Sequence, residues 1–155
     1  LTTNPFDPFC TACGSSSGSG AAVGSGLVQI ALGTETDGSV TCPAAMCGIV
    51  GLKPTVGLLP AEGVVPISSS QDTVGPMTTT VLLAAHTMDA MVLNRADTYA
   101  SSLSRDALQD LRVGVLRQHD PQPNSSEAKI YQRALEILEE QGAEDSRSGG
   151  LRVQD

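Results

Sequence analysis

The chain has 155 residues, with 17 acidic and nine basic side chains and a formal net charge of −8. This length is enough for one domain with a sizeable buried core. No apolar run approaches the roughly 20 residues that cross a bilayer, and no export signal is visible, so we expect no membrane segment and a cytoplasmic location. Because Lys and Arg are not clustered, nucleic acid is not an expected partner.

Charges are unevenly spread along the chain. Residues 1–100 contain two basic and seven acidic side chains, whereas residues 101–155 contain seven basic and ten acidic ones. Charged side chains are rarely buried, so the first hundred residues indicate the interior of a larger domain. The remainder is typical of a solvated surface.

Helices and strands are predicted to alternate in the first half. The Gly/Ser-rich turn at 14–18 should open a short helix that ends near Ser25. The apolar run 27–32, bounded by glycines, predicts a buried strand. A second short helix is expected over 41–47, followed by another buried strand over 49–52.

The second half begins with a predicted long loop over 57–77, which contains three prolines and three glycines. Thr80 can cap a helix that runs to about Leu93. Its inward face would be formed by Val81, Ala84, Ala85, Met88, Met91 and Val92.

After a polar surface connection over 96–110, the run 111–116 predicts a strand. Ser126 can cap a helix over 127–141 that stops at Gly142. Its inward line would be Ile130, Ala134, Ile137, Leu138 and Gln141. Residues 145–155 are expected to be a disordered tail, which leaves 1–144 as the domain. This alternation of strands and helices favours an α/β sheet architecture.

Two Gly/Ser-rich turns carry the candidate chemistry. The first is Cys13-Gly14-Ser15-Ser16-Ser17-Gly18-Ser19, and the second is Gly33-Thr34-Glu35-Thr36-Asp37-Gly38-Ser39, so that Ser39 follows Ser15 by 24 residues. On composition alone the first turn suits a flexible linker or a loop that cradles phosphate. No G-x-x-x-x-G-K-[ST] motif accompanies it, and the second turn at a fixed distance argues against a linker.

The paired turns resemble the amidase signature family, serine hydrolases that cleave carboxamides with a Ser–Ser–Lys triad. The resemblance continues in Pro43-Ala44-Ala45-Met46-Cys47-Gly48-Ile49-Val50-Gly51-Leu52-Lys53-Pro54-Thr55 and in Ser70-Gln71-Asp72-Thr73-Val74-Gly75-Pro76-Met77. The GTETDGS form points to the peptide-amidase-like branch, and away from the subunit that feeds ammonia to tRNA-bound glutamate. Family members are much longer, so we expect an internal fragment of an α/β/α core with a mixed sheet.

The resemblance also implies residue roles. Ser39 would be the nucleophile that forms an acyl-serine intermediate, and Ser15, held by a cis peptide bond, would relay the proton. The oxyanion hole would be formed by the backbone N–H groups of Thr36, Asp37, Gly38 and Ser39. The expected ligand is a small-molecule or peptide amide, with no cofactor and no metal, and Pro60–Gly75 is expected to border its pocket.

The third triad member, a lysine, would lie upstream of Leu1. Lys53 occupies a structural position of the motif, where we expect it to pair with a nearby acid. A catalytically inactive relative that only binds amide ligands is the alternative, because Cys13 stands where the family usually has glycine and would crowd the turn beside Ser15. His86 and His119 are expected on the surface rather than in catalysis.

The four cysteines admit several states. Cys10 and Cys13, followed by Cys42 and Cys47, have half the appearance of a four-thiolate zinc site. Buried or half-buried free thiols are the favoured interpretation, and zinc and a disulfide or redox pair are the alternatives.

Overall fold

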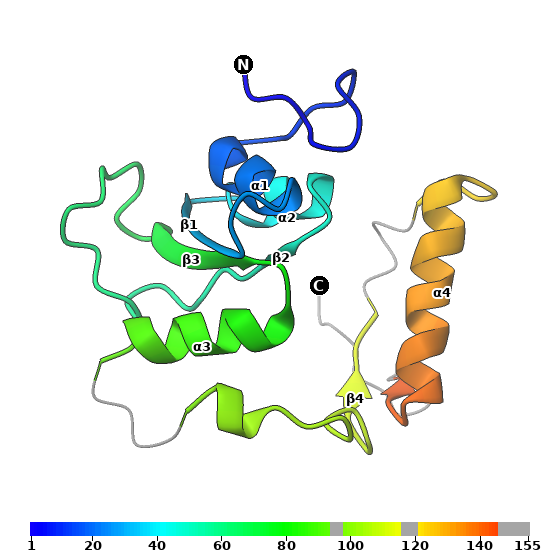
Figure 1. Cartoon of the computed structure of the whole chain (residues 1–155). Helices are drawn as coiled ribbons and strands as arrows, with labels where there is room; N and C mark the ends of the chain where they lie inside the picture. Colours follow the sequence, from blue (N-terminus) through cyan, green and yellow to red (C-terminus); the bar gives the residue numbers. More distant parts are fainter. Residues whose placement is uncertain (94–97, 116–120, 146–155) are drawn as a thin grey trace. The chain divides into compact units, whose positions relative to one another are not determined.

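The computed structural model describes residues 1–93, 98–115 and 121–145 (Figure 1). The chain divides into two compact units, Leu1–Ser102 and Leu103–Asp155. The first unit contains both Gly/Ser-rich turns. A 3₁₀ turn, η1 (Ala100–Ser102), lies at its end.

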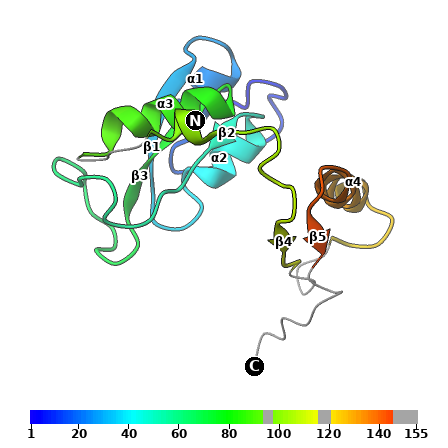
Figure 2. The same cartoon turned by 90° about the horizontal axis from the view of Figure 1, so that it is seen from below.

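A three-stranded sheet forms the centre of the first unit. Its strands are β1 (Ile30–Glu35), β2 (Val50–Gly51) and β3 (Thr73–Thr78), and β3 lies in the middle and runs antiparallel to both neighbours. Helices α1 (Ser17–Gly24) and α2 (Thr41–Met46) lie on one face of this sheet, and α3 (Val81–Met91) lies on the other (Figure 1). In the view from below, α3 lies in front of the sheet (Figure 2). The α/β class expected from the sequence is confirmed, and both short N-terminal helices are where the sequence predicted them.

The central strand β3 was predicted as part of a long loop, and that prediction is wrong. Gly75 and Pro76 hid the strand, because both residues are unfavourable inside most strands. A Cβ atom at Gly75 would overlap the carbonyl oxygen of Leu52, so the close approach of this chain segment requires glycine. Pro76 has no amide hydrogen, but its carbonyl accepts a hydrogen bond from the Leu52 amide at 3.1 Å. Tertiary packing on both sides therefore stabilises a strand that its own sequence does not favour.

The two flanking strands also differ from the prediction of buried strands. β1 begins three residues later than expected and extends to Glu35, inside the second turn. Ile30 and Leu32 are 43% and 49% exposed, whereas Gly33 and Glu35 are buried. β1 therefore alternates between a packed and an open face, as expected for an edge strand of this sheet. β2 is only two residues long and half-buried.

The core of the first unit lies between the sheet and the helices α1 and α2. Val40, Ala44 and Met77 form a buried cluster against which Ile49 packs. Small residues let the helices approach closely, since a Cβ atom at Gly20 would lie 3.2–3.3 Å from Pro43 and Met77. The two helices that follow the serine turns are thus fixed on one shared core.

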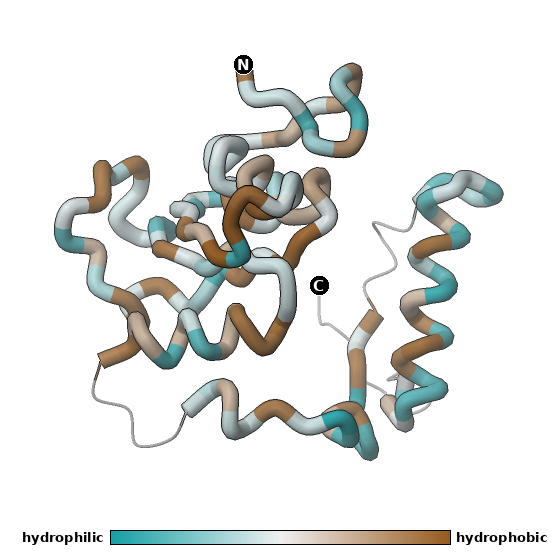
Figure 3. Tube along the Cα trace, viewed as in Figure 1, coloured by the Kyte–Doolittle hydropathy of each residue, from teal (hydrophilic) through white to brown (hydrophobic). Residues whose placement is uncertain are grey.

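Helix α3 is capped as the sequence predicted, because the Thr80 hydroxyl accepts a hydrogen bond from the Leu83 amide at 3.2 Å. Of its predicted inward face, Ala84, Ala85 and Met88 are buried, but Val81 is 58% exposed. Figure 3 shows the apolar colouring of this helix, in contrast to the many hydrophilic residues of α4 (Ser126–Glu140) in the second unit.

The second unit consists of α4 and a parallel pair of short strands, β4 (Arg112–Val113) and β5 (Glu144–Asp145). The cap of α4 is Ser125 rather than the predicted Ser126, because the Ser125 hydroxyl accepts from the Ala128 amide at 3.0 Å. The predicted inward line is also wrong, since Ile130 and Ile137 are exposed. Leu135 and Leu138 face inward instead and line a small hollow together with Val113, Val115 and Ala143.

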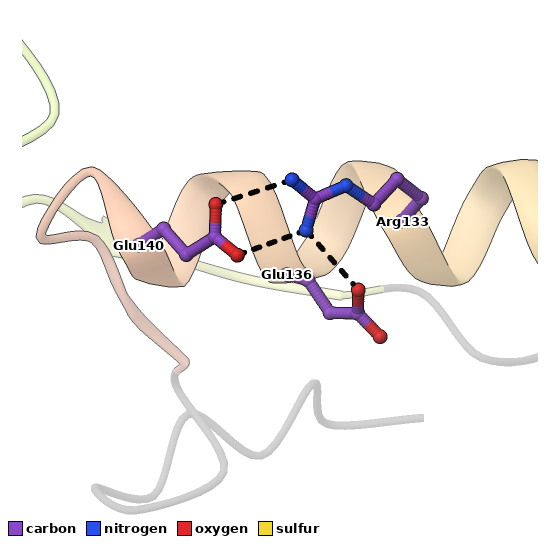
Figure 4. A network of polar contacts seen from close by, with 3 residues as sticks. All are labelled: Arg133, Glu136 and Glu140. Carbon is purple, nitrogen blue, oxygen red and sulfur yellow. Dashed lines mark hydrogen bonds and ion pairs between the residues drawn. The ribbon is translucent and has the colours of Figure 1, made fainter.

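The exposed side of α4 carries a charged network. Arg133 forms ion pairs with Glu136 at 3.3 Å and Glu140 at 2.8 Å (Figure 4). Exposed pairs of this kind contribute little to stability, so the network fits the solvated surface predicted for this part of the chain. Gly142, with φ of 91°, ends the helix as predicted. His119 and the tail beyond Asp145 lie outside the described residues.

Candidate active site

The two Gly/Ser-rich turns lie against each other. The Ser16 amide donates a hydrogen bond to the Ser39 carbonyl oxygen at 3.1 Å. The Ser16 hydroxyl also bonds both backbone groups of Thr34, donating at 3.3 Å and accepting at 3.2 Å. A Cβ atom at Gly33 would overlap the Ser16 hydroxyl oxygen, so the glycine that opens the second turn makes this approach possible. The structure thus brings together the two turns that the sequence singled out.

Among the first-turn serines, Ser15 differs from its neighbours. Ser16 is tied to β1, and so is Ser19, whose hydroxyl donates to the Leu32 carbonyl at 2.7 Å. Ser15 is exposed, and the Gly14–Ser15 peptide bond is cis, which confirms the bond that the family resemblance implied. Ser15 is therefore held by the backbone while its side chain faces an open groove.

That groove has a volume of about 480 Å³ and is lined by Ser15, Ser16, Gly18, Ser19, Leu32, Gly33, Thr34, Val64 and Val74. A neighbouring hollow of about 270 Å³ shares Leu32, Val64 and Val74 with it. Polar groups gather at the serine turn and apolar side chains form the far wall. As expected from the sequence, the segment 60–75 borders the groove.

Ser39 is half-buried, between the end of β1 and the start of α2. A buried carboxylate, Glu35, organises this turn. It is 5% exposed and accepts hydrogen bonds from the amides of Val40 at 2.7 Å and Thr41 at 2.8 Å. Burial alone would raise the pKa of Glu35, but hydrogen bonds from the backbone of Thr41, Val40 and Gly38 lower it below its ordinary value. The ionised carboxylate thus caps the N-terminal amides of α2.

Sequence analysis did not assign a role to Glu35. The available signal was an acidic residue at the end of an apolar segment, four residues before Ser39. Its position also bears on the predicted oxyanion donors, which stay a prediction. Because the Gly38 amide helps to stabilise the Glu35 carboxylate, it is the least available of the four.

Thr36 is held from two sides. The Lys53 ammonium donates to the Thr36 carbonyl oxygen at 2.7 Å, and the Thr36 hydroxyl donates to Asp72 at 2.5 Å. Asp72 also accepts from the amides of Ile67 and Ser68 at 2.7 and 2.8 Å. The Thr36 hydroxyl, these amides and the Lys53 charge lower the pKa of Asp72. Lys53 therefore bonds a backbone carbonyl rather than pairing directly with an acid, and its charge acts on Asp72 from nearby.

A disulfide joins Cys13 to Cys42, with a Cα–Cα distance of 5.9 Å. The interpretation of these two residues as free thiols is therefore wrong. The cause is tertiary, because the contact between the turns brings together residues 29 positions apart. Cys47 is a buried free thiol, as predicted, whereas Cys10 is free but exposed. Within the described ranges, no group of three or more His, Cys, Asp or Glu side chains is arranged to hold a metal ion.

The remaining sequence candidates lie away from the turns. His86 is exposed on α3, as expected, and Asp37 is exposed in the second turn. None of the helices in the described parts of the chain has the length and apolar character needed to cross a membrane.

The fold and the two joined serine turns define an α/β protein with a paired-serine site. A family model described as Amidase matches residues 1–146. The chain belongs to the amidase family.

Individual relatives agree with this assignment. The chain is 42% identical to mandelamide hydrolase from Pseudomonas putida, in an alignment that covers 91% of this chain and 27% of that protein. It is 40% identical to a glutamyl-tRNA(Gln) amidotransferase subunit from Thermotoga maritima, covering 94% and 33%. The solved peptide amidase from Stenotrophomonas maltophilia superposes with a TM-score of 0.80 at 36% identity, covering 93% and 32%. The chain thus spans about a third of the length of these relatives.

Proposed function

We propose that this chain is part of a longer amide hydrolase and carries its two catalytic serines. Ser39 is the nucleophile, Ser15 relays its proton, and the terminal base is a lysine outside the chain. The observation that carries this proposal is the hydrogen bond from the Ser16 amide to the Ser39 carbonyl at 3.1 Å. It fixes the two turns on each other while Ser15 stays exposed in the groove.

The proposed reaction begins when the Ser39 hydroxyl oxygen attacks the amide carbonyl carbon. A serine hydroxyl is a weak nucleophile, so its proton must leave as the bond forms. That proton passes to the Ser15 oxygen, and the Ser15 proton passes to the neutral lysine. When the tetrahedral intermediate collapses, the nitrogen takes a proton back through Ser15 and leaves as ammonia or an amine. Water then hydrolyses the acyl-Ser39 ester by the same proton route.

Negative charge on the carbonyl oxygen needs donors that are already in place. The second turn supplies backbone amides at the start of α2, where the helix also favours negative charge. Thr36 is fixed by Lys53 and Asp72, and the other end of the turn is fixed by Glu35. Three charged side chains thus hold the proposed oxyanion donors without occupying the groove.

The base must come from elsewhere because the chain contains only two lysines, Lys53 and Lys129. The Lys53 ammonium is engaged by the Thr36 carbonyl, and Lys129 is exposed on α4 in the other unit. We therefore expect the isolated chain to be inactive.

An inactive relative that only binds amides is not favoured. The crowding expected from Cys13 is relieved because its side chain is bonded to Cys42, and Cys13 is not among the residues that line the groove. The apolar walls formed by Leu32, Val64 and Val74 suit substrates with an apolar acyl group or side chain. Carboxamides of aryl-substituted acids and C-terminal peptide amides are thus the substrate classes to test.

The test uses the full-length protein and both substrate classes, with ammonia release as the readout. Ser39→Ala should abolish turnover and Ser15→Ala should lower kcat by at least about 10²-fold, since relay of a proton in acid–base catalysis typically contributes 10²–10⁴-fold. Ser25→Ala, at the far end of α1, is the matched control and should retain activity. Equal activity of wild type and Ser39→Ala would overturn the proposal.

A further inference from the structure

The Cys13–Cys42 disulfide connects the two serine turns covalently. Cys13 lies two residues before Ser15, and Cys42 lies three residues after Ser39, in the first turn of α2. We propose that this disulfide positions Ser15 against Ser39, so that hydrolysis is fast in the oxidised protein and slow after reduction. This inference rests on the proposed function of the two serines.

Without the disulfide, few contacts hold the two turns together. Ser16 and Ser19 attach the first turn to β1. Glu35 attaches the second turn to α2. The direct backbone link between the turns is the hydrogen bond from Ser16 to Ser39. A proton relay between two hydroxyls is sensitive to small displacements, and a misplacement of about 1 Å can lower a rate about 10²-fold.

The backbone of Cys13 gives a second reason to expect a change on reduction. Its φ angle is 58°, in the left-handed region that residues other than glycine seldom adopt. Such a conformation persists when surrounding structure enforces it. The bond to Cys42 is such a constraint, and Cys13 is separated from Ser15 by Gly14 alone. Once the bond is broken, Cys13 is free to relax, and Ser15 moves with it.

The other two cysteines are poorly suited to exchange with this disulfide. The Cys10 thiol donates to the Asp7 carboxylate at 3.3 Å, and this hydrogen bond and the negative charge raise its pKa. Burial raises the pKa of the Cys47 thiol. Since the thiolate is the species that attacks a disulfide, neither residue is an effective internal nucleophile. The reductant is therefore an external dithiol, which reaches Cys13 and Cys42 because both are only half-buried.

The redox step balances with that dithiol as the electron donor. One of its thiolates attacks Cys13 or Cys42 and forms a mixed disulfide, and its second thiolate then displaces the remaining protein sulfur. Two electrons and two protons pass to the protein, which gains two thiols, while the dithiol becomes a cyclic disulfide. Oxidised glutathione reverses the change, and two molecules of glutathione are released for each protein disulfide formed.

The experiment compares full-length protein equilibrated with oxidised glutathione and with dithiothreitol. Peptide mapping without reduction should find Cys13 joined to Cys42 in the oxidised sample only. Reduction should lower kcat by about 10-fold to 10²-fold with KM within about twofold, and reoxidation should restore it. The double variant Cys13→Ser, Cys42→Ser should match the reduced enzyme under both conditions. Cys10→Ser, the matched control, should respond as the wild type does.

Hydrogen exchange of residues 13–18 and 36–42 provides a readout that needs no turnover. Protection in both segments should fall on reduction. If the oxidised protein hydrolyses no amide but this protection changes, the proposed function fails and the positioning role of the disulfide stands. If the disulfide does not form, or if kcat and protection are the same in both states, the inference is overturned.

Discussion

The Lys53 ammonium lies 2.7 Å from the carbonyl oxygen of Thr36, and through that peptide unit it acts on the amide of Asp37. A positive charge on a carbonyl oxygen polarises the whole peptide group, because hydrogen bonds in a chain strengthen one another. The Asp37 N–H is one of the proposed oxyanion donors. Lys53 thus has a role in the site although it is not the catalytic lysine.

Replacing Lys53 by Met should lower kcat about tenfold, a fraction of the roughly 10²–10³-fold lost when a whole oxyanion donor is removed. KM should change little, because the contact acts mainly on charge that develops in the transition state. Steady-state kinetics of full-length Lys53→Met and Lys53→Arg test this, with Lys129→Met as the control. Arg should restore part of the rate. A raised KM with unchanged kcat would show that Lys53 supports substrate binding instead.

Glu35 should make stability depend on pH. Its pKa is lower in the folded protein than in the unfolded chain, so its contribution is complete above the unfolded pKa of about 4.3 and is lost as the pH falls through the folded value. Glu35→Gln should therefore destabilise the protein at neutral pH, by about 1.5–3 kcal/mol for hydrogen bonds to a charged group. The difference from wild type should shrink in acid.

Thermal unfolding midpoints at pH 7, 5 and 3 measure this difference. Glu62→Gln is a suitable control, because Glu62 is an exposed side chain in the same unit. A constant difference between Glu35→Gln and wild type at all three pH values would mean that the carboxylate charge is not the stabilising feature.

Gly75→Ala should disrupt the central strand. The added methyl would overlap the Leu52 carbonyl oxygen, which is backbone and cannot move alone. Overpacking of this kind typically costs about 1–3 kcal/mol. Gly18→Ala is the control, since a Cβ atom there has no neighbour within 4 Å and alanine favours the helix. Unfolding midpoints of the two variants should differ in that order, and equal midpoints would contradict the packing described for β3.

Local signals in the sequence were sufficient for the helices and for the two serine turns. Thr80 caps α3 as predicted, and the turns meet as their spacing indicated. These features depend on short-range chemistry: a hydroxyl beside free amides, and glycines where two backbones approach.

Features that depend on distant partners were missed. β3 is a strand because β1 and β2 flank it, although Gly75 and Pro76 disfavour one. The disulfide requires two cysteines that only the folded turns bring together. Glu35 becomes a cap only when β1 delivers its carboxylate to the start of α2. In each case the missing information is which segment packs on which, and periodicity and composition do not contain it.

Direct observation of the acyl-enzyme tests the proposed nucleophile most sharply. Full-length protein is mixed with an ester analogue of the amide substrate, quenched in acid within the first turnover, and digested for mass spectrometry. Covalent catalysis predicts one acyl group per molecule, located on Ser39, and no adduct in Ser39→Ala. An acyl group on any other residue, or turnover by Ser39→Ala, would contradict the assignment of Ser39 as the nucleophile.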